Sequence, residues 1–268
     1  MSVHSASKKG LRNQNEDKHS IIININGEDS TKQNINLYGV YDGHGGKFLS
    51  KYLEDNLPNK FLAKEITYPL SGRVINKIYK SLNEDLVKNH NRQANLCGST
   101  CLVAIEYKYN GKRFIDILNT GDSRCVMCGE DNIAQVKTMD HKPNTPDERL
   151  RIQELGGEIY YDGYDWRIKD LSVSRAFGDL DASPFVVNKP DVYRFKVKRD
   201  DKFLVLACDG LWDVLSNQEV VDLVLNNYYD IKTGNKLNVK KNIAKILAET
   251  AIQKGSSDNV TVLVVFLN

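Results

Sequence analysis

Hydrophobic residues in this chain gather in short runs rich in β-branched side chains, and polar segments separate the runs. Runs of this length and composition favour strands over helices. They predict strands at residues 20–25, 35–41, 100–107, 114–119, 203–208 and 260–266.

Helical spacing begins after the second of these strands. Apolar residues recur three or four positions apart over 48–57 and again over 74–86, which predicts two amphipathic helices. A further helix over about 239–253 is expected before the last strand. No internal repeat or change in composition divides the chain, so we expect a single domain of mixed α and β structure over 1–268.

Capping residues predict the start of two more helices. Thr145 can cap the first of them, Pro146 suits its first position, and Glu148 closes a capping box. This helix is expected to end at the glycine pair 156–157. Residues 216–219, Ser-Asn-Gln-Glu, repeat the capping-box pattern before a second apolar stretch.

Composition narrows the class of protein. Lys and Arg total 37 against 35 Asp and Glu, and this near-neutral charge gives no support for nucleic-acid binding. No apolar run approaches the roughly 18 residues that a membrane span requires. The first residues lack the apolar region of a secretory signal, and Ser2 stands where myristoylation requires glycine. We therefore expect a protein of the cytoplasm or the nucleus.

Five cysteines raise the question of a zinc site, because Cys125 and Cys128 form a C-x-x-C pair. This pair lies in a segment typical of a strand. Residues three apart on a strand point to opposite faces and cannot hold one ion together. We expect reduced, half-buried thiols rather than bound zinc.

Acidic residues follow the ends of the apolar runs. Asp42 and Asp209 each follow a predicted strand and precede glycine, Asp122 follows Gly121, and Asp258 comes directly before the last strand. Four carboxylates brought together would repel one another unless cations held them. Ligand sets made only of oxygen suit Mg²⁺ or Mn²⁺ rather than zinc.

Eight segments in order make the chain resemble the metal-dependent serine/threonine protein phosphatases of type 2C, the PPM family. They are residues 12–17 (Arg-Asn-Gln-Asn-Glu-Asp), 40–46 (Val-Tyr-Asp-Gly-His-Gly-Gly), 98–100 (Gly-Ser-Thr), 121–124 (Gly-Asp-Ser-Arg), 140–143 (Asp-His-Lys-Pro), 174–179 (Ser-Arg-Ala-Phe-Gly-Asp), 207–213 (Ala-Cys-Asp-Gly-Leu-Trp-Asp) and 258–261 (Asp-Asn-Val-Thr). The resemblance implies an α+β fold, a β-sandwich of two antiparallel sheets flanked by α-helices in four layers, with a metal centre at one end.

The resemblance also implies a set of metal ligands. Asp42 would bridge two Mg²⁺ or Mn²⁺ ions, and the carbonyl of Gly43 would join one of them. Asp209 and Asp258 would hold the other ion. Glu16 would be an outer ligand, directly or through water.

Four more residues receive roles by resemblance. Asp17 would orient metal-bound water, and Arg12 would bind the substrate phosphate with its forked guanidinium. His44 would be the general acid that protonates the leaving oxygen. Asp122 would help to bind a third, weaker ion found in some members.

The implied reaction hydrolyses phosphoserine or phosphothreonine by attack of a metal-bridging hydroxide, without a covalent intermediate. The partners would be phosphorylated proteins in signalling, and the chain a monomer that binds neither nucleic acid nor membrane. A silent pseudophosphatase scaffold and a metal-dependent phosphodiesterase are the alternatives. Neither is favoured, because the ligand acids are retained and no basic or aromatic track for a polyanion is present.

Other motif residues have a structural interpretation. Asp179 and Asp213 could bond backbone groups at turns, and Thr100 could satisfy hydrogen bonds at a strand start. His141 and Lys142 are interpreted as a turn before the capped helix.

One segment departs from the family pattern. Residues 166–171, Trp-Arg-Ile-Lys-Asp-Leu, lack the glycine that the family usually has beside the active site, and the segment is one residue shorter. We hypothesise that Tyr164 and Trp166 form part of the substrate rim.

Overall fold

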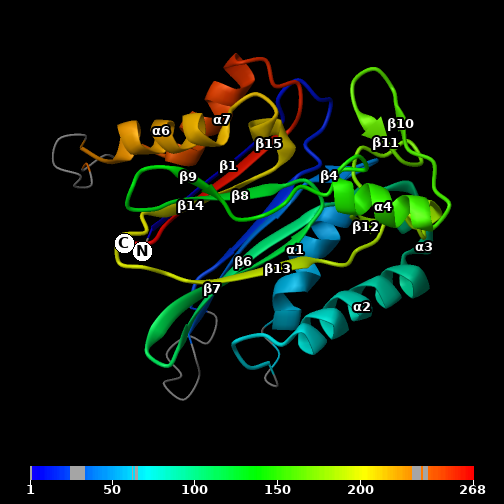
Figure 1. Cartoon of the computed structure of the whole chain (residues 1–268), viewed down its shortest axis with the longest axis horizontal. Helices are drawn as coiled ribbons and strands as arrows, with labels where there is room; N and C mark the ends of the chain where they lie inside the picture. The colour runs from blue at the N-terminus through cyan, green and yellow to red at the C-terminus, as the bar shows by residue number, and fades with distance from the viewer. Residues whose placement is uncertain (1, 25–33, 62, 64–65, 231–236, 238–240) are drawn as a thin grey trace.

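Two antiparallel five-stranded sheets face each other in the computed structural model, which describes residues 2–24, 34–61, 63, 66–230, 237 and 241–268 (Figure 1). The first sheet has the order β1 (Ser2–Lys8), β15 (Val260–Phe266), β14 (Phe203–Ala207), β8 (Arg124–Cys128) and β9 (Ala134–Val136). The second has the order β13 (Asp191–Lys196), β7 (Lys112–Thr120), β6 (Cys101–Tyr109), β3 (Ile35–Tyr41) and β2 (Lys18–Ile22).

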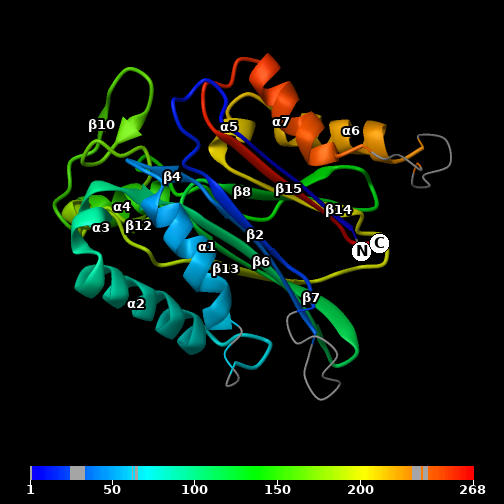
Figure 2. The same cartoon turned by 180° about the vertical axis from the view of Figure 1, so that it is seen from behind.

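Helices cover the outer face of each sheet, and views from opposite sides show the same four layers (Figures 1 and 2). Beside the second sheet lie α1 (Phe48–Phe61), α2 (Gly72–Asn89) and α3 (Asn91–Leu96). Beside the first sheet lie α5 (Asp209–Trp212), α6 (Asn217–Tyr228) and α7 (Ile243–Gln253). The expected α+β sandwich is confirmed.

Short elements gather at one end of the sandwich, away from the chain termini (Figure 1). A three-stranded sheet there consists of β4 (Gly43–His44), β5 (Gly98–Ser99) and β12 (Phe177–Gly178). Near it lie α4 (Pro146–Glu154), the 3₁₀ turn η1 (Leu180–Ala182) and the hairpin of β10 (Tyr160–Tyr161) and β11 (Trp166–Arg167).

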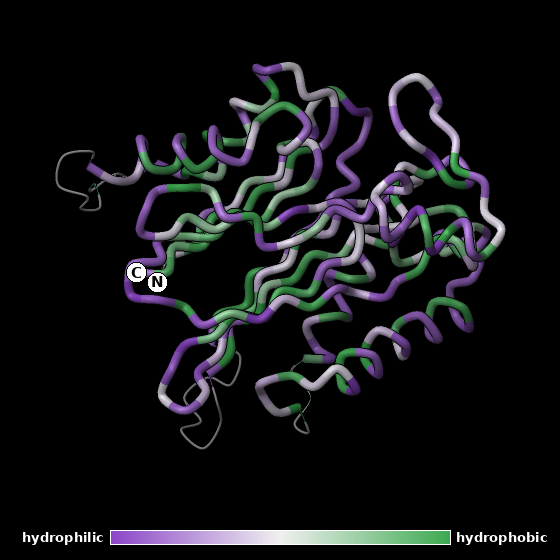
Figure 3. Tube along the Cα trace, in the orientation of Figure 1, coloured by the Kyte–Doolittle hydropathy of each residue, from purple (hydrophilic) through white to green (hydrophobic). Residues whose placement is uncertain are grey.

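Both faces of the central strands are buried, which explains why their sequences are continuously apolar. Along β14, Phe203 and Val205 pack with the helices of the first sheet. Leu204 and Leu206 point the other way and pack between the sheets. Hydrophobic residues accordingly concentrate in the strands, whereas the connecting segments are more polar (Figure 3).

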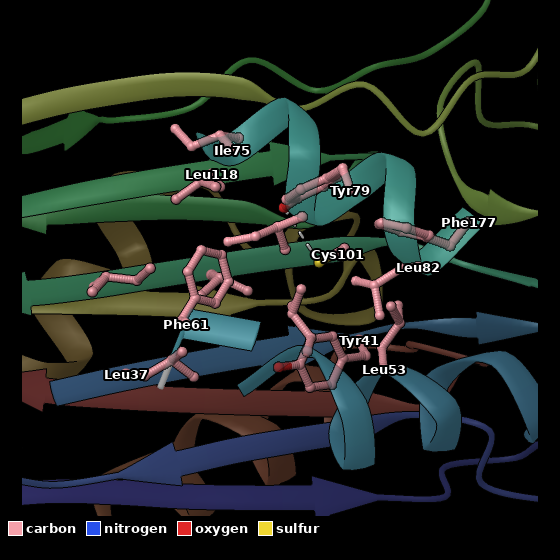
Figure 4. Packing of buried hydrophobic residues seen from close by; sticks show 14 of the residues in the cluster. Leu37, Tyr41, Leu53, Phe61, Ile75, Tyr79, Leu82, Cys101, Leu118 and Phe177 are labelled. Atoms are coloured by element: carbon pink, nitrogen blue, oxygen red, sulfur yellow. Dashed lines mark hydrogen bonds between the residues drawn. The ribbon is translucent and has the colours of Figure 1, made fainter. Parts of the chain in front are cut away.

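The second sheet packs against α1 and α2 through a cluster that includes Leu53, Tyr79 and Phe177 (Figure 4). The Tyr79 hydroxyl and the Cys101 thiol are 3.7 Å apart and satisfy each other inside this cluster. All five cysteines are buried and unpaired. Cys125 lies between the sheets and Cys128 on the helix side of β8, as expected for opposite faces of one strand.

The strand predictions were correct for the central strands and incomplete at the edges. Residues 35–41 and 260–266 are strands as predicted, whereas β2 covers Lys18–Ile22 instead of 20–25, of which residue 25 lies outside the described part. The edge strands β1, β9 and β13 were not predicted. An edge strand exposes part of its surface, so its sequence carries polar residues and no apolar run.

One of the two predicted capping boxes is present. The Ser216 side chain accepts from the Glu219 N–H, and the Glu219 carboxylate accepts from the Ser216 N–H at 2.8 Å. The prediction of a capping box at Thr145 is wrong. The Thr145 hydroxyl donates instead to the Lys142 carbonyl, and the Glu148 carboxylate forms ion pairs with two arginines. α4 nevertheless begins at Pro146 and ends at Glu154, before the glycine pair.

The last helix begins later than predicted. α7 starts at Ile243, where the side chain of Asn242 accepts a hydrogen bond from the Lys245 N–H. The predicted start at residue 239 lies outside the described residues. Among the described residues, no helix combines the length and apolar character needed to cross a membrane.

We predict that Leu263→Ala lowers the free energy of unfolding by about 2–5 kcal/mol, because it leaves a cavity between the sheets. Leu150→Ala is the control, since Leu150 is 58% exposed on α4, and should change stability by less than about 0.5 kcal/mol. Urea unfolding of both variants measures the difference. Equal losses would contradict the assigned core.

Candidate metal centre

A cleft of about 820 Å³ opens at the end of the sandwich that carries the short strands. Its walls come from segments distant in sequence, including the loop after β1, the β3–β4 junction and the start of α5. Eight of the nine residues expected in the site line it: Arg12, Glu16, Asp42, Gly43, His44, Asp122, Asp209 and Asp258. The ninth, Asp17, is buried and does not line the cleft.

Three carboxylates form the centre of this cleft. Asp42, Asp122 and Asp209 each offer an oxygen within 4.8 Å of the others. Each residue follows the end of a buried strand, β3, β7 and β14 respectively. Since β3 and β7 belong to one sheet and β14 to the other, the sandwich brings the three acids together.

Hydrogen bonds to the backbone hold these acids at the boundary between the core and the cleft. The Thr100 N–H donates to the Asp42 carbonyl at 2.9 Å, and the Thr100 hydroxyl accepts from the Asp42 N–H at 3.1 Å. The same hydroxyl lies 2.8 Å from that of Ser123, next to Asp122. Thr100 thus satisfies hydrogen bonds at a strand start, as predicted, and ties two acid-bearing loops together.

Burial makes ionisation of these acids unfavourable. Burial, and then repulsion by neighbouring carboxylates, raises the pKa of Asp42 and of Asp209 well above the usual range. Burial also raises the pKa of Asp17 and of Asp122 to about 6. The folded chain therefore concentrates carboxylates whose mutual repulsion is relieved either by protonation or by a nearby positive charge.

Unpartnered oxygens show that the site fits a cation. Within the described part of the chain, both carboxylate oxygens of Asp17 and Oδ2 of Asp122 are buried without a hydrogen-bond partner. The converging donors of the cleft are carboxylates, the ligand type that Mg²⁺ and Mn²⁺ prefer. Asp17 lies behind Asp42, near the thiol of Cys208, with ligand atoms of all three within 4.8 Å.

The fourth acid, Asp258, is engaged by arginine. Its Oδ2 accepts from Nη2 of Arg12 at 2.7 Å, and the Arg12 side chain is 59% exposed. The loop that carries Arg12 approaches closely at Gly10, where φ is +60° and a Cβ would lie 2.0 Å from the Asp258 carbonyl oxygen. Only glycine is suited to this approach.

Asn259 organises the same loop, and sequence reasoning did not select it. Its side-chain amide donates to the carbonyls of Lys9 and Gln14, and its Oδ1 accepts from the Glu16 N–H at 2.8 Å. Glu16 in turn accepts from the Gly46 N–H at 3.1 Å. The position of Asn259 within the Asp-Asn-Val-Thr motif was the available signal.

His44 pairs with Asp179 across the cleft, with Nε2 2.7 Å from Oδ2. The interpretation of Asp179 as a turn acid bonding backbone is therefore wrong. A Cβ on Gly98 would lie 2.1 Å from that oxygen and 2.4 Å from Nε2, so glycine makes room for the pair. Burial alone would lower the pKa of His44, but the hydrogen bond and charge of Asp179 outweigh it and raise that pKa.

Two more motif residues, Asp213 and Lys142, lie beside the acids of the cleft, so their role is more than forming a turn. Asp213 lines the cleft, and partial desolvation of its carboxyl, together with the charges of Asp165 and Asp258, raises its pKa. Lys142 places Nζ 3.7 Å from Oδ2 of Asp122. The sequence interpretation of both as turn residues was incomplete, because the facing acids are far away along the chain.

The rim hypothesis needs correction. Asp165 and Arg167 line the cleft, whereas the neighbouring Tyr164 and Trp166 do not. Successive side chains on a strand point to opposite sides, and Trp166 turns toward the ring of Tyr161. Tyr164 is 89% exposed. The segment around this departure therefore faces the cleft with charged residues, among them Asp165 and Arg167.

Comparison with known proteins agrees with this geometry. The family model described as "Protein phosphatase 2C" matches residues 1–260. "Probable protein phosphatase 2C 59" of Arabidopsis thaliana is 37% identical over 262 residues, covering 97% of this chain and 78% of that protein. The chain therefore belongs to the protein phosphatase 2C family of serine/threonine phosphatases.

Solved structures show the same fold. A "C.elegans sex determining protein" matches with a TM-score of 0.86 and 25% identity, over 100% of this chain and 65% of that chain. "Serine-threonine phosphatase 2C from Toxoplasma gondii" matches with a TM-score of 0.79 and 24% identity, over 98% of this chain and 94% of that chain.

The raised acid pKa values predict how the metal-free protein responds to pH. An unfolded Asp has a pKa of about 3.9, so between pH 4 and 6 the folded chain binds more protons at Asp122 than the unfolded chain. In EDTA, lowering the pH from 7 to 5 should therefore add about 1 kcal/mol of stability through Asp122. Asp122→Asn should lose this gain and the exposed Asp200→Asn should keep it, as urea unfolding at each pH would show.

The ion pair of His44 generates a second prediction. Asp179→Asn removes the group that raises the pKa of His44, so this pKa should fall. NMR titration of the histidine ring measures it. Asp181→Asn, which also removes an acid from the cleft lining, is the matched control. A fall of equal size in both variants would show that general charge, and not the pair, sets the pKa.

Proposed function

We propose that this chain is a metal-dependent protein phosphatase that hydrolyses phosphoserine and phosphothreonine directly with water. The convergence of Asp42, Asp122 and Asp209, which are buried or half-buried and repel one another, is the observation that supports this most strongly. Family membership supplies the reaction class. We propose further that residues 1–268 act as one catalytic domain and a monomer, with phosphoproteins as substrates.

The ligands proposed for two Mg²⁺ or Mn²⁺ ions are Asp42, the Gly43 carbonyl, Asp209 and Asp258, with Glu16 as an outer ligand. Asp122 would belong to a third, weaker ion. When bound, the ions would lower the pKa of a water molecule and neutralise charge on the phosphate. The side chains around the ions are proposed to bind the phosphate, donate a proton and orient water.

Arg12 is proposed to bind the substrate phosphate. Its exposed guanidinium already contacts a carboxylate at the cleft, and the same fork can pair with two phosphate oxygens. In the free chain Asp258 restrains this side chain. Arg12 therefore exchanges one anionic partner for another when substrate enters.

His44 is proposed as the general acid. Asp179 holds the proton on Nε2 and favours the doubly protonated ring, which leaves the Nδ1 proton for the departing serine or threonine oxygen. Proton donation to a poor leaving group contributes roughly 10²–10⁴-fold to a rate. Asp17, which is buried behind Asp42, is proposed to orient water at the centre.

We predict that the protein hydrolyses a phosphothreonine peptide at neutral pH with Mn²⁺ or Mg²⁺, and that EDTA abolishes turnover. Asp209→Asn should lower kcat at least about 100-fold, because a charged group at the centre is lost. Asp200→Asn, an exposed acid outside the cleft, should keep full activity. Phosphate release is the measurement.

Two outcomes would overturn the proposal. Metal binding without turnover above the Asp209→Asn background would indicate a scaffold. Preference for bis-p-nitrophenyl phosphate over the phosphopeptide would indicate a phosphodiesterase.

A further inference from the structure

One lysine reaches into the acid cluster from outside the proposed ligand set. Nζ of Lys142 lies 3.7 Å from Oδ2 of Asp122, and the Asp122 side chain is 2% exposed. Within the described residues, no other Lys or Arg forms an ion pair with Asp42, Asp122 or Asp209. The nearby Arg124 is committed to Asp140, at 2.6 Å.

The backbone holds Lys142 in this place. The preceding His141 exchanges two hydrogen bonds with Gly121, the neighbour of Asp122: its N–H donates to the Gly121 carbonyl and its Nδ1 accepts from the Gly121 N–H. Nε2 of His141 is 3.1 Å from a carboxylate oxygen of Asp191. The segment carrying Lys142 is therefore tied directly to the loop carrying Asp122.

The residue after the turn holds the other side of Lys142. The Lys142 carbonyl accepts from both the N–H and the hydroxyl of Thr145, at 3.1 and 2.8 Å. This contact explains why Thr145 does not cap α4 with its side chain. The Thr145 side chain holds the Lys142 backbone in place instead.

Several acids attract the ammonium group in this position. Asp122 is its closest partner, and the charges of Asp213 and Asp209 also act on it. An ammonium group thus shares the Asp122 carboxylate that family resemblance assigns to a third ion. A divalent cation at that carboxylate would meet a like charge a few ångströms away.

We propose that Lys142 is a built-in competitor for the metal ion at Asp122, and that it sets the weak affinity of this position. The inference rests on the proposed function, because it presumes a metal centre. Lys142 partly neutralises Asp122 without an ion, so an ion that binds there must displace the ammonium. Of the ligands proposed for the other two ions, Asp258 has a cationic partner in the exposed guanidinium of Arg12, whereas no ion pair with Lys or Arg is present at Asp42 or Asp209 within the described residues.

The test is Mn²⁺ binding to the metal-free protein, measured by isothermal titration calorimetry and by the EPR signal of free Mn²⁺. Lys142→Met removes the charge and keeps the length of the side chain. It should tighten the weakest class of sites by about tenfold, a modest share of what one unit charge exerts at this distance. Lys142→Arg keeps the charge and should leave that class as weak as in the original protein.

Two further variants make the test specific. Asp122→Asn should remove the weak class, and adding Lys142→Met to it should change Mn²⁺ binding no further. Lys169→Met removes a positive charge from the lining of the same cleft and should have little effect on the weak class.

Three results would overturn the inference while leaving the proposed function standing. They are unchanged weak binding in Lys142→Met, an equal gain in Lys169→Met, and a full gain that persists in the Asp122→Asn background. A protein that binds no divalent ion would overturn the proposed function and the inference together. Binding is read without substrate, so loss of catalysis cannot be mistaken for either result.

Discussion

Repulsion among buried and half-buried carboxylates is the constraint on which the rest of this structure depends. Asp42, Asp122 and Asp209 converge at the end of the sandwich, where burial and mutual charge disfavour ionisation. Such a cluster persists only on a rigid frame that cannot relax by separating its acids. Two sheets with both faces packed provide that frame, because moving one strand end would disturb the core behind it.

Short contacts transmit this rigidity to the cleft. Thr100 joins two of the acid-bearing loops, and Asn259 ties the loop of Arg12 and Glu16 to the start of β15. Glycine at 98 admits the ion pair of His44 because no Cβ blocks it. The chemistry at the cleft thus depends on residues that never need to touch a substrate.

Much of the fold could be predicted because its signals are local. Strands buried on both faces have continuously apolar sequences, and the capping box at Ser216 is complete within four residues. The edge strand β1 was not predicted, because its half-exposed sequence carries no apolar run. The cap at Thr145 failed because Lys142 and two arginines compete for the same groups.

The sequence by itself determined which chemistry is present: acids after buried strands, next to glycine, in the order of one enzyme family. Only the tertiary structure decided the partners. Asp179 pairs with His44, Lys142 with Asp122 and Arg12 with Asp258. The partners in these pairs are 20 to 246 residues apart along the chain. Periodicity and capping report on neighbours along the chain, whereas an ion pair depends on distance in space. Packing of the two sheets sets that distance.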